Sequence, residues 1–481
     1  MSTRLLVATL FAALLGGGGL SIPLHAQSGP DAPTSEAAWT GSWEGLLPVP
    51  GAELRVVLHL DRTDSGLTGT MDSPDQGASD IPLGDITATD DSLTLDVPSI
   101  AGRYEGVRTA PDTVQGTWIQ GDIEPNLTLA RTDTPSQVNR PQQPEAPFPY
   151  ATEDVTFATI AEEGHTLAGT FSHPDANEPV PAVVLISGSG PHTRTGETAG
   201  HETLTVLADH LTRQGIAVLR YDERGQGESE STLRGATTPM LADDVRGALT
   251  YLQDRSEVDA ERISLVGHSE GGLIAGYLGA RHPELVDVLV LVGSPGIPGD
   301  AILGDQLASS AERAGMQSSR VNAQVEVQQR VFDILKQDAD STTIVSDLRA
   351  FIAETSGLAE GEMVEGEIRS LMDPWFRFFV QYDPTSDLQQ LTQPVLALLG
   401  ERDQQVRPAM NAEPLEAALH TAPTSTYDVV VLDALNHLFQ TAETGAPSEY
   451  AQIEETMAPD VLDRIATWIL EHSADRRSAD E

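Results

Sequence analysis

The stretch Arg262–Pro283, RISLVGHSEGGLIAGYLGARHP, decides the fold of this chain. The apolar residues Ile263–Val266 predict a short buried strand, and Leu273–Leu278 predict a helix. Between them stands Gly-His-Ser-Glu-Gly, a Gly-x-Ser-x-Gly turn in the context that makes it a nucleophile elbow. A strand, this turn and a helix in succession indicate an α/β protein.

Each residue type in this turn has a physical reason. The turn brings the strand and the helix close together, and glycine at Gly267 and Gly271 removes the Cβ atoms that would clash there. We therefore expect Ser269 at the end of a sheet, next to the positive end of a helix dipole.

Length and charge limit what the protein can be. A chain of 481 residues suggests two domains. The formal net charge is −45, from 73 acidic and 28 basic residues, and this excludes nucleic-acid binders, which need a basic face. Lys336 is the only lysine, which favours adaptation to high salt over a merely acidic proteome. The chain has no cysteine, so disulfides and a cysteine nucleophile are excluded.

The first 26 residues have the pattern of a signal peptide. Arg4 precedes the apolar run Leu5–Leu15, and Leu24–Ala26 ends in a small residue suited to cleavage. Gly16–Gly19 cuts the run short of the roughly 20 apolar residues that a membrane span needs. We expect export to the periplasm or the medium, with no membrane span.

Residues 36–131 alternate with period two and predict a small antiparallel β-domain. Trp39, Trp43 and Trp118 in it either line a ligand groove or belong to the core, as aromatic residues in small β-domains usually do. A proline-rich linker, expected to be extended, follows at 132–150. The predicted strands are Leu54–Leu60, Leu67–Met71, Leu93–Val97, Val114–Trp118 and Leu127–Leu129.

From 151 to 475 strands and helices alternate, which predicts a mostly parallel α/β sheet. The polar, helix-favouring segment at about 300–370 interrupts the alternation and is interpreted as a helical cap over the end of the sheet. The expected strands are Val155–Ile160, Thr166–Phe171, Ala182–Ile186, Ile216–Tyr221, Ile263–Val266, Val288–Val292, Val395–Leu399 and Tyr427–Leu432.

An acid and a histidine each follow a late strand of this sheet. Asp403 stands in Gly-Glu-Arg-Asp after one strand, and His437 stands in Asn-His-Leu-Phe after the last. The order Ser269, Asp403, His437 is that of a Ser-Asp-His triad. In such a triad the histidine takes the proton of the serine, and the acid orients the histidine and stabilises its cation. The weaker candidates are His420, which falls in the middle of a predicted helix, His268, inside the elbow, and Asp433, too near His437 in sequence.

Two backbone N–H groups are expected to receive the oxyanion of such a reaction. One is that of Glu270, at the start of the helix, and the other that of Ser189, in the loop Ser-Gly-Ser-Gly-Pro. Neither a cofactor nor a catalytic metal is expected, because the histidines at 165, 173, 192 and 201 have no metal-ligand spacing.

From about Val155 to its end the chain resembles the α/β-hydrolase superfamily, near its serine-aminopeptidase-like and dienelactone-hydrolase-like branches. The resemblance lies in Gly188–Pro191, Arg224–Gly227, Gly267–Gly272 and Gly400–Val406. Asp373–Phe379 and Asp72–Gly77 also resemble exported bacterial esterases that carry an N-terminal β-domain. One departure is Ser187, at a position where many relatives have histidine before the oxyanion loop.

The resemblance implies hydrolysis of a small-molecule carboxylic ester with a short or medium acyl chain. A serine peptidase or aminopeptidase of the same fold is the first alternative. A carbohydrate- or surface-binding protein with an idle hydrolase fold is the second, and an intact triad argues against it. A dehalogenase would need aspartate in place of Ser269. The sequence leaves the oligomeric state open.

Overall fold

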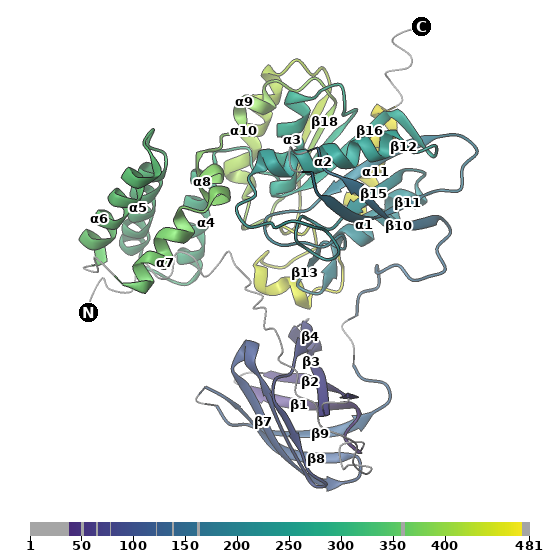
Figure 1. The fold of residues 1–481 in the computed structure, drawn as a ribbon, viewed down its shortest axis with the longest axis vertical. Coiled ribbons are helices and arrows are strands. Elements are labelled where there is room, and N and C mark those ends of the chain that lie inside the picture. The colour runs from purple at the N-terminus through teal and green to yellow at the C-terminus, as the bar shows by residue number, and fades with distance from the viewer. Residues whose placement is uncertain are drawn as a thin grey trace.

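A computed structural model describes residues 38–473, except for gaps at 50–51, 64–65, 77, 122, 137–138, 161–163 and 357–360. Two parts follow each other along the chain, an N-terminal β-domain and a larger α/β-domain with protruding helices (Figure 1). The predicted signal peptide, residues 1–26, lies outside the described residues.

The β-domain is one antiparallel sheet that curves into a half-barrel, in the order β4-β3-β2-β1-β9-β8-β7-β6-β5. Residues 83 and 84 connect the two ends of this sheet, because Leu83 N–H donates to Gly69 O of β3 across 3.0 Å and Gly84 N–H donates to Asp96 O of β6 across 2.8 Å. Strands occupy all five predicted ranges, and β1, β4, β5 and β7 are additional. The strands are β1 (Gly41–Val49), β2 (Ala52–Thr63), β3 (Gly66–Ser73), β4 (Ala78–Pro82), β5 (Ile86–Ala88), β6 (Ser92–Val97), β7 (Gly102–Ala110), β8 (Thr113–Gln120) and β9 (Asn126–Thr132).

The concave side of the half-barrel is filled by its own side chains. Trp39, Trp43 and Trp118 are at most 1% exposed and pack in one cluster with Tyr104 and the inward leucines and valines. Their large apolar surfaces stabilise the sheet by burial. These tryptophans are core residues, so they do not form the ligand groove that was the other interpretation of the sequence.

The linker after β9 is attached to the α/β-domain by hydrogen bonds. The Arg140 guanidinium donates to the carbonyls of Ala451 and Ile453, each across 2.9 Å. Gln142 accepts the N–H of Thr456 and donates to Met457 O across 2.6 Å. The 3-10 turn η2 (Pro74–Gln76) of the β-domain contacts η4 (Pro447–Gln452) of the α/β-domain.

The α/β-domain is built on an eight-stranded sheet in the order β10-β11-β15-β12-β16-β17-β18-β19. β11 is antiparallel to its neighbours, and the pairs from β15 through β12 to β19 are parallel. The strands are β10 (Ala151–Ala158), β11 (Thr166–His173), β12 (Val180–Ile186), β15 (Ala217–Tyr221), β16 (Val258–His268), β17 (Leu289–Val292), β18 (Val395–Gly400) and β19 (Tyr427–Leu432). A short hairpin, β13 (Glu197–Thr198) and β14 (His201–Glu202), follows β12.

Helices cover both faces of this sheet, as a parallel sheet requires. One face packs against α1 (Thr203–Arg213) and α11 (Pro459–His472). The other packs against α2 (Thr238–Gln253), α3 (Glu270–Arg281) and α10 (Pro408–Thr421). The carboxyl ends of β12, β16, β17, β18 and β19 therefore meet at one edge. The predicted α/β-hydrolase fold class is confirmed.

The cap is a set of helices inserted between β17 and β18, and it projects from the sheet (Figure 1). It runs to α8, past the predicted end near 370, whereas α9 packs against α3 and α10 of the α/β-domain. Its own apolar core includes Leu273 of α3, which joins the cap to the elbow. The cap helices are α4 (Gly299–Arg313), α5 (Ser318–Leu335), α6 (Ser341–Ser356), α7 (Glu362–Leu371) and α8 (Pro374–Gln381), and α9 (Thr385–Leu388) follows them.

Among the described residues, no helix combines the length and the apolar character needed to cross a bilayer.

Candidate active site

Ser269 lies on a strained turn between β16 and α3. Its backbone has φ 54° and ψ −118°, a conformation that a non-glycine residue rarely adopts. A Cβ atom at Gly267 would lie 2.1 Å from the carbonyl oxygen of Gly271, and one at Gly271 would lie 2.4 Å from that of Ile186. Both positions thus require glycine, and the hydroxyl-bearing residue is held at the carboxyl edge of the sheet, as the sequence predicts.

Asp403 and His437 meet at the same edge, although 34 residues separate them in the chain. His437 Nδ1 lies 2.7 Å from Asp403 Oδ2, and these residues are 4% and 2% exposed. The other carboxylate oxygen of Asp403 accepts the N–H groups of Gln405 and Val406, at 2.7 and 2.8 Å. The acid is therefore fixed by its own loop and can orient the imidazole.

His268 forms a contact with the catalytic candidates that sequence reasoning did not predict. Its Nε2 lies 2.9 Å from the backbone carbonyl of His437, and since a carbonyl only accepts, Nε2 must carry the hydrogen. Burial, together with the neighbouring His437, lowers the pKa of His268 to about 3. His268 is therefore a neutral donor that ties the elbow to the loop of His437.

Ser189 lies in the loop after β12, beside the elbow. A Cβ atom at the preceding Gly188 would lie 3.2 Å from Ser269 Cβ, so this loop passes directly against the serine. The first N–H groups of a helix have no partner within it, which leaves that of Glu270, the first residue of α3, available. The two predicted oxyanion donors thus flank Ser269 from two different segments.

A buried acid, Glu223, holds the beginning and the end of this loop. It accepts the hydroxyl of Ser187 across 2.6 Å and the N–H of His192 across 3.0 Å. Burial raises the pKa of Glu223 to about 8. The departure at Ser187 thus has a structural explanation, because the serine pairs with Glu223. The sequence did not predict this pairing, because Ser187 and Glu223 are 36 residues apart in the chain.

Asp433 and His420, the other competing candidates, lie elsewhere. Asp433 is exposed. Among the described contacts, the acid that meets a ring nitrogen of His437 is Asp403. His420 is in the last turn of α10, where it is exposed and contacts the hydroxyl of Tyr427.

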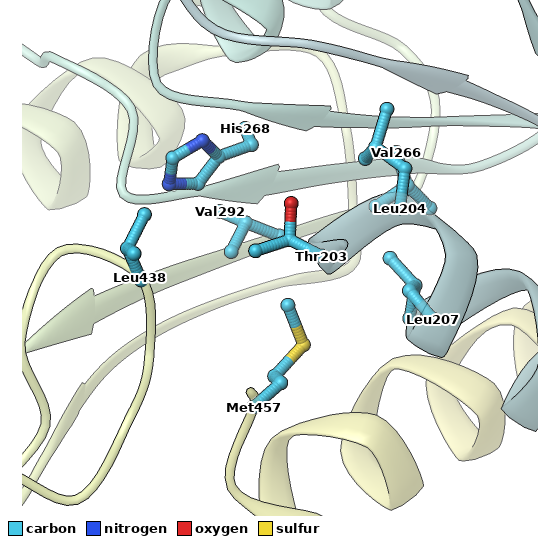
Figure 2. A pocket seen from close by; sticks show the side chains of 8 residues that line it. All are labelled: Thr203, Leu204, Leu207, Val266, His268, Val292, Leu438 and Met457. Carbon is cyan, nitrogen blue, oxygen red and sulfur yellow. The ribbon is translucent and has the colours of Figure 1, made fainter. Parts of the chain in front are cut away.

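A small apolar cavity lies behind the elbow, between the sheet edge and α1 (Figure 2). Its volume is about 20 Å³, room for about one water molecule, so it is too small to hold an acyl chain. Figure 2 shows the ring of His268 at one side of the cavity, with the Leu438 side chain on the same side and that of Met457 below. It is lined by Thr203, Leu204, Leu207, Val266, His268, Val292, Leu438 and Met457.

One group among the described residues has metal-ligand spacing, Glu153, His173 and Glu257. Arg255 Nη2 lies 3.0 Å from a carboxylate oxygen of Glu153 and 3.0 Å from one of Glu257. The chain's own cation thus pairs with both acids. The group lies at the start of β16, the opposite edge of the sheet from Ser269.

Comparison with known families agrees with this geometry. Residues 177–441, more than half of the 481-residue chain, match the model of the serine aminopeptidase family S33. The chain belongs to the serine aminopeptidase S33 family. The match begins just before β12 and ends just after His437, so this S33 region includes the elbow, the cap and all three triad candidates.

Among individual relatives, esterase EstD of Thermotoga maritima is 26% identical over 305 residues. The alignment covers 63% of this chain and 65% of EstD, so the chain spans less than two thirds of that relative. The solved esterase Pf2001 of Pyrococcus furiosus is 16% identical, with 68% of this chain and 92% of that one covered and a TM-score of 0.42. A dienelactone hydrolase of Anabaena variabilis is 17% identical, with 67% and 98% covered and a TM-score of 0.37.

Proposed function

We propose that this S33-family protein is an exported serine hydrolase that cleaves carboxylic esters through an acyl-enzyme intermediate. One observation carries the proposal. The buried His437–Asp403 pair, 2.7 Å apart, is tied by His268 to the elbow that holds Ser269 at φ 54°. Nucleophile, base and orienting acid are thus supplied by three loops at one edge of the sheet.

The residues have distinct roles in this mechanism. Ser269 Oγ attacks the ester carbonyl carbon, and His437 takes its proton through Nε2 while Nδ1–H remains bonded to Asp403. The oxyanion is received by the backbone N–H groups of Ser189 and Glu270. His437 then protonates the leaving alcohol, and a water molecule, deprotonated by the same histidine, releases the acid and regenerates Ser269.

The choice between an ester and an aminoacyl amide rests on charge. An aminopeptidase needs an anionic group to hold the ammonium ion of its substrate. Glu223 and Glu270 are buried acids beside the elbow and the oxyanion loop, and burial raises the pKa of both, so the anionic form is less favourable in them than in an exposed glutamate. This supports an ester substrate, and the name of the EstD relative supports it too. Aminoacyl amides remain the second candidate because of the family model.

The proposed range of short or medium acyl chains rests on α8. Trp375 Nε1 lies 2.7 Å from the carboxyl group of Glu270, which places a bulky ring directly against the elbow. Export is proposed from the pattern of residues 1–26.

A single set of assays tests these points. A fluorophosphonate probe should label wild type but not Ser269→Ala, and p-nitrophenyl esters with acyl chains of increasing length should be cleaved faster than aminoacyl p-nitroanilides. Ser269→Ala should lose roughly 10³-fold or more in turnover while its melting temperature stays near that of wild type. Labelling that survives Ser269→Ala would exclude this nucleophile. Faster cleavage of the anilides would favour the aminopeptidase alternative.

A further inference from the structure

Gln405, two residues after the proposed acid Asp403, connects that acid to two other parts of the molecule. Its backbone N–H donates to Asp403 Oδ1 across 2.7 Å. Its side-chain Nε2 donates to the hydroxyl of Tyr450 across 3.0 Å, and its carbonyl accepts Nε2–H of Gln306 in α4, also across 3.0 Å. The residue that holds the acid is therefore itself held from η4 and from the cap.

Tyr450 reaches Gln405 from a segment 45 residues further along the chain. It lies in η4, and its side chain is buried, at 4% exposure, whereas Gln405 is half-buried. A tyrosine hydroxyl usually has a hydrogen-bond partner when its ring is buried, because an unpaired hydroxyl would lose its water without replacement. The Tyr450–Gln405 bond supplies that partner, and it limits the positions that Gln405 can take next to the acid.

The position of Tyr450 depends in turn on what holds η4. A 3-10 helix has poorer internal hydrogen bonds than an α-helix, so η4 needs contacts from outside. His201 of β14 is fully buried, and its Nε2 lies 2.8 Å from Tyr450 O. Arg140 of the linker donates to the carbonyls of Ala451 and Ile453, each across 2.9 Å. The turn that carries Tyr450 is therefore fixed by the hairpin and by the linker.

Arg140 uses its whole guanidinium group on the backbone. A guanidinium has five N–H donors in a rigid planar fork. Five hydrogen bonds of 2.9 to 3.4 Å run from Arg140 to carbonyl oxygens, so this one side chain joins η4 to the hairpin of β13 and β14. The acceptors belong to Asn139, Ala199, Gly200, Ala451 and Ile453.

We propose that Tyr450 is a positioning residue for the acid of the triad, acting through Gln405, and that Arg140 of the linker keeps Tyr450 in place. This inference rests on the proposed serine-hydrolase function. Tyr450 and Arg140 act on the reaction from a distance, through the placement of Asp403 against His437. The segment that leads out of the β-domain is thereby part of the support of the proposed active site.

The test uses substitutions in the full chain. Tyr450→Phe removes the hydroxyl alone, Gln405→Met removes the donor on the other side of the same bond, and Arg140→Ala removes the guanidinium. Arg140→Lys keeps the charge but has three donors on a flexible stem in place of the planar fork. Tyr104→Phe is the matched control for the tyrosine, because Tyr104 is fully buried in the β-domain and donates its hydroxyl to a backbone carbonyl across 3.2 Å. Arg131→Ala is the control for the arginine, since the Arg131 guanidinium also donates to backbone carbonyls, within the β-domain.

Four quantities are measured for each variant. They are kcat and KM on a p-nitrophenyl ester, the rate at which a fluorophosphonate labels Ser269, the melting temperature, and one proton NMR resonance. That resonance belongs to the hydrogen between His437 Nδ1 and Asp403, which is expected far downfield because it is shared between two electronegative atoms. Asp403→Asn should remove it, and this assigns the signal.

Tyr450→Phe and Gln405→Met should each lower kcat and the labelling rate by about 3- to 10-fold, the equivalent of one neutral hydrogen bond. KM should change less than about 2-fold, because the lost contact serves the chemical step and not substrate binding. The downfield resonance should broaden or move upfield in both variants. Tyr104→Phe and Arg131→Ala should stay near wild type in kcat, labelling rate and resonance.

Two combinations show whether the effects run through the proposed route. In the Asp403→Asn background, Tyr450→Phe should lower the labelling rate by less than about 2-fold further, because the orientation of the acid is already lost. Arg140→Ala should lower kcat by about 3-fold or more, and its loss should be less than additive with that of Tyr450→Phe, because Arg140 acts through Tyr450. Arg140→Lys should resemble Arg140→Ala.

Wild-type kcat, labelling rate and resonance in Tyr450→Phe and Gln405→Met would overturn the inference, and Gln405→Met carries the test if Tyr450→Phe does not fold. Additive losses in the Asp403→Asn background would also overturn it. A wild-type rate in Arg140→Lys beside an impaired Arg140→Ala would show that charge alone matters at this position. Failure of the proposed function is distinguishable, because wild type would then not be labelled at Ser269, whereas the resonance needs no nucleophile.

Discussion

The imidazole of His268 donates Nε2–H to the backbone carbonyl of His437 across 2.9 Å, and the two rings lie with centroids 4.8 Å apart. The residue before the proposed nucleophile thus holds the residue proposed as its base. Because burial keeps the pKa of His268 at about 3, this donor stays neutral and keeps its hydrogen throughout the pH range of an assay. The elbow therefore positions both Ser269 and His437.

His268→Ala should lower kcat by about 3- to 10-fold, the equivalent of one neutral hydrogen bond. His268→Gln should recover most of the rate, because the glutamine Nε2 can reach the same carbonyl. Steady-state kinetics between pH 5 and 9 would check this, and wild-type kcat in His268→Ala would contradict the positioning role. The pH profile of wild type should show no step from His268, since its pKa lies below that range.

Asp403→Asn tests the acid of the proposed triad. The variant should fold normally yet lose about 10²- to 10⁴-fold in turnover, because the amide favours the wrong histidine tautomer. Asp433→Asn is the matched control, because Asp433 is exposed and close to His437 in sequence. Turnover numbers and melting temperatures of both variants give the answer. A wild-type rate in Asp403→Asn would mean that another carboxylate orients His437.

Glu223 should make stability depend on pH. Burial raises its pKa to about 8, whereas an unfolded glutamic acid titrates near about 4.3. A raised pKa contributes stability that is complete below the unfolded value and is lost as pH rises through the folded value. The melting temperature of Glu223→Gln relative to wild type should therefore increase from pH 5 to pH 9.

The control for this comparison is Glu362→Gln, which removes one negative charge from an exposed position of the cap. Its melting temperature relative to wild type should change little over the same pH range. A constant difference between Glu223→Gln and wild type would show that Glu223 does not titrate in this window. Glu223→Gln should also keep its activity above pH 8. In wild type, an ionised Glu223 next to the oxyanion loop would oppose the negative charge of the oxyanion there.

The sequence predicted the α/β-hydrolase fold because that fold leaves strong local signals. The elbow is a contiguous motif with apolar runs on both sides, and Asp403 and His437 each follow a β-branched or leucine-rich strand. Residues at the carboxyl ends of parallel strands meet at one edge whatever the details of packing. The assignment of Ser269, Asp403 and His437 thus follows from topology, while their catalytic roles stay predictions.

The remaining parts of the site depend on contacts between segments distant in the chain. Ser187 and Glu223 are 36 residues apart, and Glu270 and Trp375 are 105 apart, so no local pattern reports either pair. The additional β-domain strands were missed for a different reason. β5 has three residues, and β7 alternates with polar and glycine residues that carry little apolar signal.

The last prediction is salt dependence, and it rests on charge. With 73 acidic and 28 basic residues, the folded chain brings together like charges that the unfolded chain can spread apart. Repulsion between surface charges is screened over about 10 Å at 0.1 M salt and about 3 Å at 1 M. The melting temperature should therefore rise from low salt to molar sodium chloride. Sucrose, an uncharged osmolyte that is also excluded from protein surfaces, should stabilise less at matched exclusion, because it screens no charge. A flat sodium chloride profile would mean that the acidity is only compositional and that the protein is not adapted to a saline setting.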